Sequence, residues 1–217
     1  MIHIAHIADS HFDARNRFDD NIAVHEAFIA QAREAKVDLI LHSGDVYERA
    51  SSPLERNAAL RFFRDASSIA PVVIARGNHD AFDDPRIEKV QVVDVEGYRI
   101  VTTPDLRPED RPIEMIIERD FKGMNPDIIV GGDTHVDRLE YRDGIVLINS
   151  GSPNIPHHKE TRLGTVGLLE VTRNHVHAEV ILLGQTEGSP NPGTPRHMEL
   201  HDGRLIAASL RGEPLSI

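Results

Sequence analysis

Short apolar runs alternate with helical patterns over the first third of the chain. Residues 2–8, 37–44 and 71–75 are apolar runs of strand length. Between them, residues 22–36 and 53–66 place apolar side chains at roughly helical spacing. Strands that alternate with helices predict a largely buried, mainly parallel sheet at the centre of the fold.

From residue 90 onward the pattern changes to short β-prone runs. They are VQVVDV, YRIVT, IEMII, DIIVG, IVLINS, VGLLEV and VHAEVILL. They predict a second, more antiparallel layer, so that the two halves together form an α/β sandwich. Residues 184–197 are rich in glycine and proline, which predicts a loop or tail. We therefore expect one core domain over residues 1–183 and an extension over 184–217 with at most one short strand, RLIAASL.

Composition narrows the class of protein. The 217 residues are 40% hydrophobic and 27% charged, which is ordinary for a globular protein. No stretch approaches the roughly 20 apolar residues that cross a bilayer, and the N-terminus has no basic region followed by an apolar run. We expect a cytosolic (cytoplasmic) protein without a membrane partner.

Cysteine content and net charge limit the chemistry. Without cysteine, any metal must be held by His, Asp, Glu or Asn. The net charge of −11 argues mildly against a polyanionic partner such as nucleic acid. Bound cations would change the potential at a metal cleft, so composition leaves the substrate open.

Four segments place metal-competent side chains directly after predicted strands. They are Asp9-Ser10-His11, Gly44-Asp45, Gly77-Asn78-His79-Asp80 and Gly132-Asp133-Thr134-His135. Ligands of α/β sheets bind outside the carboxyl ends of the strands, so the four segments are expected to converge on one crevice. Each segment alone also fits a solvated turn, whereas the ordered set indicates a metal site.

The motifs DSH, GDV, GNHD and GDTH, followed by INSGSP, resemble in this order those of the calcineurin-like metallophosphoesterases. The resemblance covers residues 1 to about 183 and implies a four-layer α/β/β/α sandwich. The stretches VDLILHSGDVYERASSP, PVVIARGNHD and NSGSP most resemble the SbcD-type DNA double-strand-break repair nucleases. Those nucleases usually carry a DNA-capping domain and a docking segment for an ATPase partner, for which 217 residues leave little room.

The resemblance also implies roles for single residues. Asp45 would bridge to a second metal ion, which Asn78 also ligates. A hydroxide shared by two cations about 3.5–4 Å apart would attack phosphorus in line. His79, fixed by Asp80, would protonate the leaving oxygen or stabilise its developing charge. The first ion would be bound by Asp9, His11, Asp45 and His135.

The second metal site departs from the family pattern, which has two further histidines. One stands at the first polar position of a G-H-x-H motif, where this chain has Asp133. The other follows an upstream strand, yet no histidine lies between His79 and His135. Taken as that strand, IEMIIERDF offers three residues where histidine is expected: Glu118, Arg119 and Asp120.

Two interpretations of this departure stay open. If Asp133 and either Glu118 or Asp120 coordinate, the second site suits Mn²⁺ or Mg²⁺ better than Zn²⁺. If they do not, Arg119 could supply a fixed positive charge in a one-metal enzyme or a binding-only relic. We expect Mn²⁺, as two ions or one, with Mg²⁺, Fe or Zn²⁺ as alternatives.

Basic residues offer candidate phosphate contacts. Arg15 and Arg17 follow the first ligands, and the fork of arginine suits phosphate, although surface arginines in a loop are equally expected. The most basic stretch could contact a nucleic-acid backbone, but a solvated loop fits it somewhat better. It contains His157, His158, Lys159 and Arg162.

Three functional hypotheses follow. The leading one is a metal-dependent phosphodiesterase, a nuclease that hydrolyses DNA. The first alternative is a phosphatase or phosphodiesterase of small nucleotide substrates, which the acidic charge favours. The second is a non-catalytic metal-binding subunit that serves an SbcC-like ATPase partner. By resemblance, a homodimer through residues 53–66 is also open.

Overall fold

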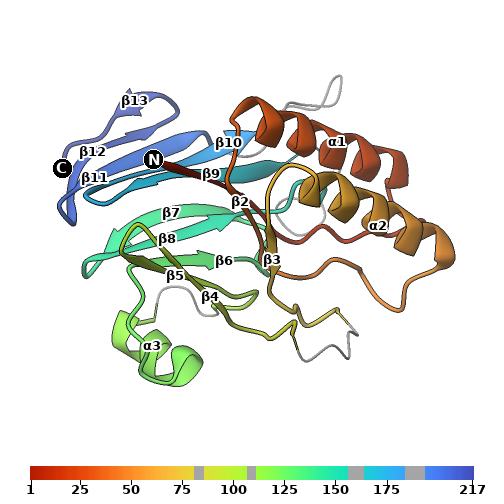
Figure 1. The fold of residues 1–217 in the computed structure, drawn as a ribbon, viewed down its shortest axis with the longest axis horizontal. Coiled ribbons are helices and arrows are strands. Elements are labelled where there is room, and N and C mark those ends of the chain that lie inside the picture. Colours follow the sequence, from red (N-terminus) through yellow and green to blue (C-terminus); the bar gives the residue numbers. More distant parts are fainter. Residues whose placement is uncertain (81–85, 107–110, 156–163, 184–193) are drawn as a thin grey trace.

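Two β-sheets stack face to face between layers of helix in the computed structural model (Figure 1). Helices α1 (Phe18–Glu34) and α2 (Pro53–Ser67) cover one sheet, and α3 (Ile113–Phe121) packs on the other. This arrangement confirms the predicted α/β/β/α sandwich. None of the helices in the described part of the chain is long and apolar enough to cross a membrane. The structure describes residues 1–80, 86–106, 111–155, 164–183 and 194–217.

The first sheet has eight strands among these residues, in the order β13-β12-β11-β10-β9-β1-β2-β3. Strands β1, β2 and β3 run parallel, whereas β9 lies antiparallel to β1 and the C-terminal strands follow as antiparallel neighbours. At the centre, Ile4 pairs with Leu39 on one side and Leu169 on the other. The strands are β1 (Ile2–Ile7), β2 (Leu39–His42), β3 (Val72–Ile74), β9 (Thr165–Thr172), β10 (His175–Leu182), β11 (Arg196–His201), β12 (Arg204–Leu210) and β13 (Glu213–Pro214).

The second sheet has five strands in the described residues, in the order β4-β5-β6-β8-β7. Its centre, β5-β6-β8, is parallel, and its two edge strands are antiparallel. We expected β9 and β10 in this layer, which was wrong, because β9 forms hydrogen bonds with β1 of the first sheet. The strands are β4 (Gln91–Val95), β5 (Tyr98–Thr102), β6 (Ile128–Gly131), β7 (Asp137–Arg142) and β8 (Ile145–Ser150).

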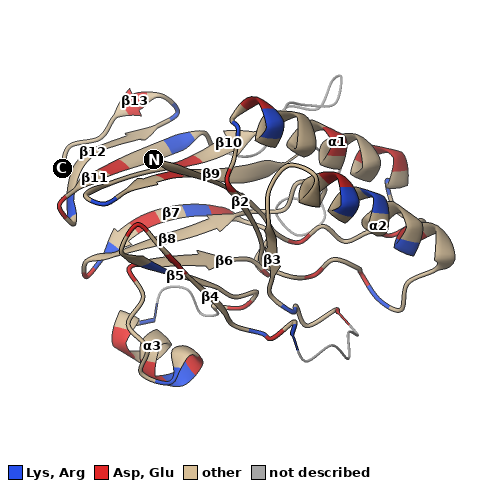
Figure 2. Ribbon diagram, in the orientation of Figure 1, with Lys and Arg blue, Asp and Glu red and all other residues tan. Residues whose placement is uncertain are grey.

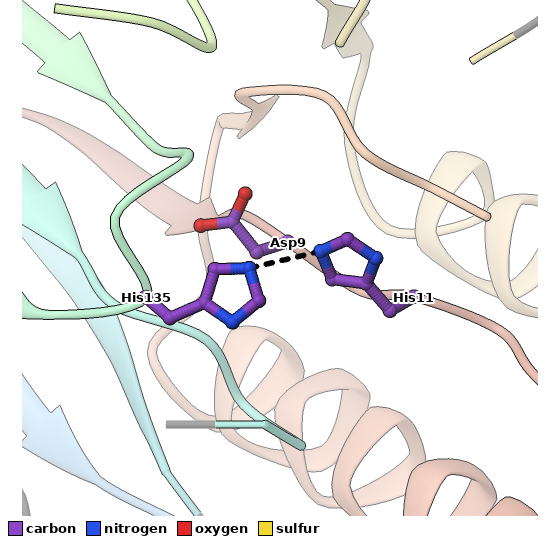
Figure 3. Close-up of side chains that lie close together, drawn as sticks. All are labelled: Asp9, His11 and His135. Atoms are coloured by element: carbon purple, nitrogen blue, oxygen red, sulfur yellow. Dashed lines mark hydrogen bonds between the residues drawn. The ribbon is translucent and has the colours of Figure 1, made fainter. Parts of the chain in front are cut away.

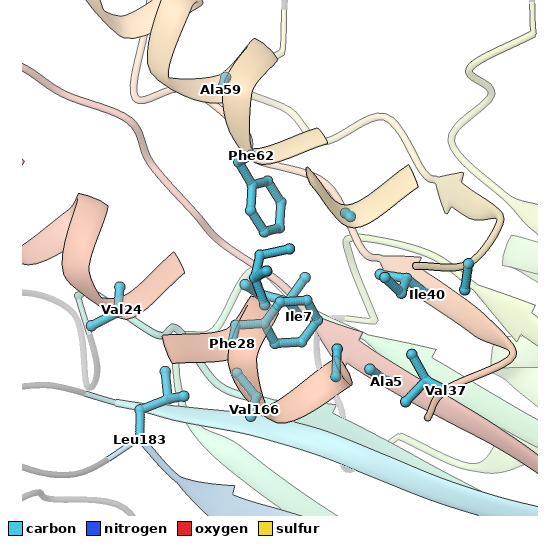
Figure 4. Close-up of a cluster of buried hydrophobic side chains, with 14 of the residues drawn as sticks. Ala5, Ile7, Val24, Phe28, Val37, Ile40, Ala59, Phe62, Val166 and Leu183 are labelled. Carbon is cyan, nitrogen blue, oxygen red and sulfur yellow. The ribbon is translucent and has the colours of Figure 1, made fainter. Parts of the chain in front are cut away.

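Three clusters of buried apolar side chains fill the interfaces between the layers. Phe28 of α1 and Phe62 of α2 pack on Ile7 and Ile40 of the first sheet (Figure 4). A second cluster lies between the two sheets, and a third lies between the second sheet and α3. Every residue of β6 and β8 is buried, because both faces of these strands are covered.

The start of α2 is fixed by a capping box that also reaches the first ligand loop. Ser52 caps the backbone N–H of Glu55 at 3.3 Å, and Glu55 accepts a hydrogen bond from the N–H of Ser52. The same carboxylate accepts a hydrogen bond from the N–H of Ala14 at 2.7 Å. Helix α2 is thereby tied to the loop that follows β1.

The segment IEMIIERDF is helix α3 and not the strand that we expected. Its buried residues, Ile113, Ile116 and Phe121, recur at helical spacing, and Ile117 adds to the same face. The short run of apolar letters resembled a strand, but the side chains do not alternate between two faces. The strand that precedes β6 in the sheet is therefore β5.

The C-terminal stretch holds more structure than the single short strand expected there. The expected strand RLIAASL is β12, and it pairs with β11 and β13 on its two sides. Met198 and Leu200 of β11 are buried in the cluster between the sheets. The missed signal is the turn Asp202-Gly203, both residues of which have positive φ, as a tight hairpin requires. The domain boundary at residue 183 stays a prediction.

Packing between the sheets predicts an unequal effect of two matched substitutions. Ile148→Ala should lower the free energy of unfolding by about 2–5 kcal/mol, because Ile148 is fully buried in the cluster between the sheets. Ile206→Ala should change it by less than about 1 kcal/mol, since Ile206 is 53% exposed. Urea unfolding followed by circular dichroism measures both; equal losses would contradict the assigned core.

Candidate metal centre

The four predicted segments meet at one edge of the two sheets. The loops after β1 and β2 are joined by hydrogen bonds from Asp9 N to Gly44 O at 3.1 Å and from His11 N to Asp45 O at 3.0 Å. The N–H of His79, after β3, donates to Asp45 Oδ1 at 2.9 Å. The N–H of Asp133, after β6, donates to Asp9 Oδ1 at 2.9 Å. The predicted convergence of strand ends is therefore what the chain forms.

Asp9, His11 and His135 form one compact group of ligand atoms (Figure 3). One atom from each residue lies within 4.8 Å of the others, and the two imidazole Nε2 atoms are 3.0 Å apart. Asp9 and His11 are buried. A carboxylate and two imidazoles are common ligands of divalent transition metals.

The partners of the two imidazoles determine which ring atoms face each other. Nδ1 of His135 lies 2.8 Å from the carbonyl oxygen of Ile155, so Nδ1 carries the hydrogen and donates it. Nδ1 of His11 lies 2.9 Å from Glu48 Oε2. When both rings carry their hydrogen on Nδ1, both Nε2 atoms present lone pairs to each other; when His11 carries it on Nε2, the two atoms form the hydrogen bond drawn in Figure 3. This pair of lone pairs favours a cation between them.

A second group lies beside the first and is built from oxygen ligands. The amide end of Asn78 lies 3.1 Å from Asp45 Oδ2 and 3.1 Å from Asp133 Oδ1. With its nitrogen turned inward, Asn78 donates to both carboxylates. With its oxygen turned inward, three oxygens surround one point, which suits a hard cation such as Mg²⁺ or Mn²⁺. All six predicted ligands are thus brought together.

Five of the ligand residues have a left-handed backbone conformation, which seven other non-glycine residues of the described chain also adopt. All five of the Asp and His ligands have positive φ: Asp9 at 51°, His11 at 42°, Asp45 at 54°, Asp133 at 70° and His135 at 58°. Residues other than glycine adopt this region rarely, although Asp and His do so more readily than most. Such backbone clusters at functional sites, where the surrounding structure holds it in place.

Two glycines permit the close approach of the loops. A Cβ on Gly77 would lie 2.1 Å from Asp45 Oδ1, and a Cβ on Gly44 would lie 2.6 Å from the backbone nitrogen of Gly77. Gly44 also has a φ of 91°, which a side chain would strain. Glycine is therefore required before Asp45 and before Asn78, because any side chain there would clash with the neighbouring loop.

The structure gives His79 and Asp80 partners other than the expected ones. We expected Asp80 to fix the His79 ring, but its carboxylate accepts hydrogen bonds from Val46 N and Gly77 N at 2.8 and 3.0 Å. Burial raises the pKa of the Asp80 carboxyl. Nδ1 of His79 instead donates to the carbonyl oxygen of Glu48 at 2.6 Å. Asp80 thus holds the two loops together, and His79 stands exposed at the entrance of the site.

A cavity of about 540 Å³ opens over the two groups. On its wall, the buried carboxylate of Asp13 contacts Arg15 Nε at 2.9 Å and Arg49 Nη2 at 3.0 Å. The two guanidinium groups are more than half exposed, so Asp13 orients them without burying them. Arg15 was a predicted phosphate contact, whereas Arg49 was not predicted.

Arg17, the other predicted phosphate contact near β1, lies elsewhere. Its Nε contacts Asp20 Oδ2 at 2.9 Å, and its Nη1 donates to the carbonyl oxygen of Asn154 at 2.6 Å. The residue has positive φ and begins α1. The cavity lining does not include it among the described residues. Arg17 therefore connects the start of α1 to the loop that contains Asn154.

None of the three candidates in IEMIIERDF lines the described part of the cavity. They lie on helix α3, which packs on the far face of the second sheet (Figure 1). Asp120 forms an ion pair with Arg111, and the exposed Arg119 contacts Asp120 at 3.4 Å. The expectation that Glu118, Arg119 or Asp120 replaces a histidine is therefore wrong.

The end of β5 is the true counterpart of the upstream strand, because β5 is the parallel neighbour of β6. The next residue, Thr103, is buried, and its N–H bonds the carbonyl of Val130 at 3.0 Å. Its hydroxyl finds no hydrogen-bond partner among the described residues. A threonine at this strand end offers a poorer metal ligand than histidine.

Buried histidines support the first ligand loop from below. The N–H of Gly44 donates to His42 Nδ1 at 3.1 Å, so His42 Nε2 carries the hydrogen and donates to Ser10 Oγ at 2.8 Å. Ser10 Oγ then donates to His25 Nε2 at 2.8 Å, and His25 Nδ1 donates to the carbonyl of Asn21 at 2.7 Å. Every step of this chain has one donor and one acceptor, which fixes Ser10 between Asp9 and His11.

Sequence reasoning missed Glu48, which orients His11 through Nδ1. The contact with the His11 imidazole lowers the pKa of the Glu48 carboxyl. His11, Glu48 and His79 also form a further group, in which one ligand atom of each residue lies within 4.8 Å of the others. The sequence signal that could have indicated Glu48 is its position three residues after the predicted ligand Asp45. The basic candidates His157, His158, Lys159 and Arg162 lie outside the described residues.

Comparisons with known proteins agree with this geometry. The family model of the calcineurin-like phosphoesterase superfamily domain matches residues 2–174. A probable metallophosphoesterase of Methanocaldococcus jannaschii is 27% identical over 150 residues, which are 69% of this chain and 67% of the relative.

Solved structures share the fold at low identity. Wild-type Vps29 of Entamoeba histolytica, complexed with Zn²⁺, has a TM-score of 0.65 at 16% identity and covers 93% of this chain and 99% of its own. A novel archaeal phosphodiesterase has a TM-score of 0.58 at 17% identity, over 83% of this chain and 99% of its own. These likenesses concern the fold alone.

Three buried histidines predict a loss of stability in acid. Burial lowers the pKa of His6 and of His42 from 6.5 to about 3, and that of His25 to about 4. The unfolded chain therefore binds more protons below pH 6.5, so stability falls as the pH drops toward 4. Between pH 7 and pH 5 the loss should reach about 2 kcal/mol per histidine.

Urea unfolding at both pH values, with EDTA present so that metal release does not contribute, measures this loss. His6→Gln should reduce the pH dependence, whereas His201→Gln, on an exposed side chain, should leave it unchanged. A free energy of unfolding that is the same at pH 7 and pH 5 would contradict the assignment.

Proposed function

We propose that this chain, which belongs to the calcineurin-like phosphoesterase superfamily, is a phosphodiesterase that hydrolyses nucleotide substrates, DNA strands included. Membership supports a metal-dependent phosphoesterase; the proposal concerns the bond and the substrate. It rests above all on the two Nε2 atoms of His11 and His135, which face each other at 3.0 Å beside Asp9.

The ligand residues divide the proposed centre into two halves. Asp9, His11 and His135 would hold one cation, and Asn78 and Asp133 would hold a second with Asp45 between them. When bound, such cations activate water and stabilise charge on phosphoryl oxygens. The second half offers oxygen atoms, so we propose Mn²⁺, with Mg²⁺ as the alternative.

His79 is the proposed proton donor to the leaving oxygen. Its Nδ1–H is held by the carbonyl oxygen of Glu48, so a protonated ring has Nε2–H left to give. The ring lies at the entrance of the cavity, where a leaving group would depart. Asp80 supports it indirectly, by bonding the loop that carries His79.

Arg15 and Arg49 support a substrate with more than one anionic group. Their guanidinium groups share Asp13 and line the same cavity as the metal ligands, so they suit a phosphate next to the reacting one. Figure 2 shows basic residues mixed with acidic ones on α1, α2 and α3, and no continuous basic stripe on these helices. This distribution favours short or single-stranded nucleotide substrates over a long duplex.

A second candidate function is a metal-binding protein without turnover. Thr103 at the end of β5 favours it, because among the described residues the second half of the centre then depends on Asp45, Asn78 and Asp133. An ATPase partner or a homodimer through α2 would fit this role. Leu54 and Leu60 of α2 are 55% and 61% exposed and are the residues to test for such contacts.

Loss of Asp45 tests hydrolysis directly. Asp45→Asn should lower kcat/KM for a chromogenic bis-aryl phosphate with Mn²⁺ by roughly 100-fold or more, because charge stabilisation at the reacting centre is lost. Asp94→Asn, a matched change on an exposed aspartate of β4, should retain activity. Equal rates in all three proteins, or none in the wild type with any divalent metal, would reject the enzyme and favour the second candidate.

The arginine pair tests the substrate class. Arg15→Ala should lower kcat/KM for short single-stranded DNA by about 10-fold, since a charge-assisted hydrogen bond contributes about 1.5–3 kcal/mol. Arg119→Ala removes an exposed arginine from α3, far from the cavity, and should have no effect. Equal effects of the two changes would refute the contact. Competition of bis-aryl phosphate hydrolysis by duplex DNA separates duplex from smaller substrates.

A further inference from the structure

One face of the first sheet gathers imidazole and carboxylate side chains far from the centre described above. His3 of β1, Glu170 of β9, His177 of β10 and Glu199 of β11 are direct cross-strand neighbours in that order. Histidine and glutamate therefore alternate across four adjacent strands. Direct neighbours of this kind have Cβ atoms about 4.5–5.5 Å apart, within reach of each other's side chains.

The alternation along β10 fixes which way these residues point. Val176, Ala178 and Val180 are buried, and the first two belong to the cluster between the two sheets. Because neighbouring residues of a strand face opposite sides, His175 and His177 lie on the outer face. Their side chains are 30% and 16% exposed, so this part of the face is only partly covered.

Glu199 lies between the two histidines. Its Oε1 is 3.6 Å from His177 Nδ1, and its Oε2 is 4.0 Å from His175 Nε2. On the other side, His177 Nε2 is 2.8 Å from Glu179 Oε1. The imidazole of His177 is thus placed between two carboxylates, with one ring nitrogen directed at each.

The 2.8 Å contact between His177 Nε2 and Glu179 determines whether Nδ1, the other ring nitrogen of His177, carries a hydrogen in the neutral ring. Glu179 accepts the hydrogen of His177 Nε2, which leaves the lone pair of Nδ1 facing the carboxylate of Glu199 in the neutral ring. The hydrogen bond with Glu179 and the charges of the neighbouring carboxylates raise the pKa of His177, so a cation is favoured at Nδ1, where a metal ion would displace a proton. A carboxylate that fixes one imidazole nitrogen so that the other can bind a metal is a common support of metal sites.

We propose that His175, His177 and Glu199 form a surface site for a divalent transition metal such as Zn²⁺, with Glu179 as the residue that positions His177. Around a tetrahedral ion with bonds of about 2.0–2.1 Å, ligand atoms are roughly 3.3 Å apart. The observed separations of 3.6 and 4.0 Å exceed this by less than 1 Å. The three side chains do not form a compact group of ligand atoms as they stand, so they must rotate toward one another to bind an ion.

Such an ion would connect β10 to β11. His175 and His177 lie on β10, and Glu199 lies on β11, where it pairs directly with His177. The site is independent of the proposed hydrolysis, because none of its residues lines the catalytic cavity. Its ligands include imidazole nitrogens, which favour zinc-like ions over Mg²⁺.

Zinc stoichiometry tests the proposal on the full chain. Isothermal titration with Zn²⁺, checked by metal analysis after dialysis, should give one more ion per chain for the wild type than for His175→Gln/His177→Gln. His3→Gln is the matched control on the same face and should bind as many ions as the wild type. The double variant should hydrolyse bis-aryl phosphate at the wild-type rate.

Glu179→Gln provides a second measurement if the double variant fails to fold by circular dichroism. It should weaken the additional zinc site by 10- to 100-fold while leaving its stoichiometry at high zinc unchanged. Equal stoichiometry in the wild type and the double variant overturns the proposal. So does an equal loss in His3→Gln, or an unchanged zinc affinity in Glu179→Gln.

Discussion

The structure depends on one constraint: the Nε2 atoms of two imidazoles are held 3.0 Å apart at the meeting point of two sheets. His11 comes from the loop after β1, and His135 comes from the loop after β6. Ile155 and Glu48 hold the opposite ring nitrogens, so neither imidazole can turn away without losing a partner. This arrangement requires strained backbone: five ligand residues have positive φ. It also requires glycine at positions 44 and 77, where a Cβ atom would clash with neighbouring atoms.

Stability of the loops below the site comes from a polar chain that is satisfied at every step. Ser10 lies between two ligand residues and is bonded by His42 and His25, both of which stay neutral because they are buried. Asp80 performs a similar task for the loops after β2 and β3. The position of the ligands therefore depends on these supporting residues as well as on the residues that line the cavity. Because the supporting histidines are buried and neutral, the stability of the fold decreases in acid.

The motifs predicted the site well, because Asp and His side chains that follow glycine at four strand ends converge when the strands form parallel sheets. The sandwich was predicted for the same reason, from strands that alternate with helices. Sequence reasoning failed where a short apolar run fits two periods, as in α3, and where pairing partners are distant in the chain, as for β9 and β10. Glu48 and Asp13 were missed because their roles exist only after distant loops come together.

The position of β1 has a consequence for how the chain folds during synthesis. Its neighbours are β2 on one side and β9 on the other, and Ile4 pairs with Leu169, a separation of 165 residues (169 minus 4). Strand β1 leads into Asp9 and His11. One of its edges therefore cannot pair until the C-terminal third of the chain has left the ribosome. Pairings of such long range fold slowly, and until β9 has been made the unpaired edge of β1 is open to pairing with other chains.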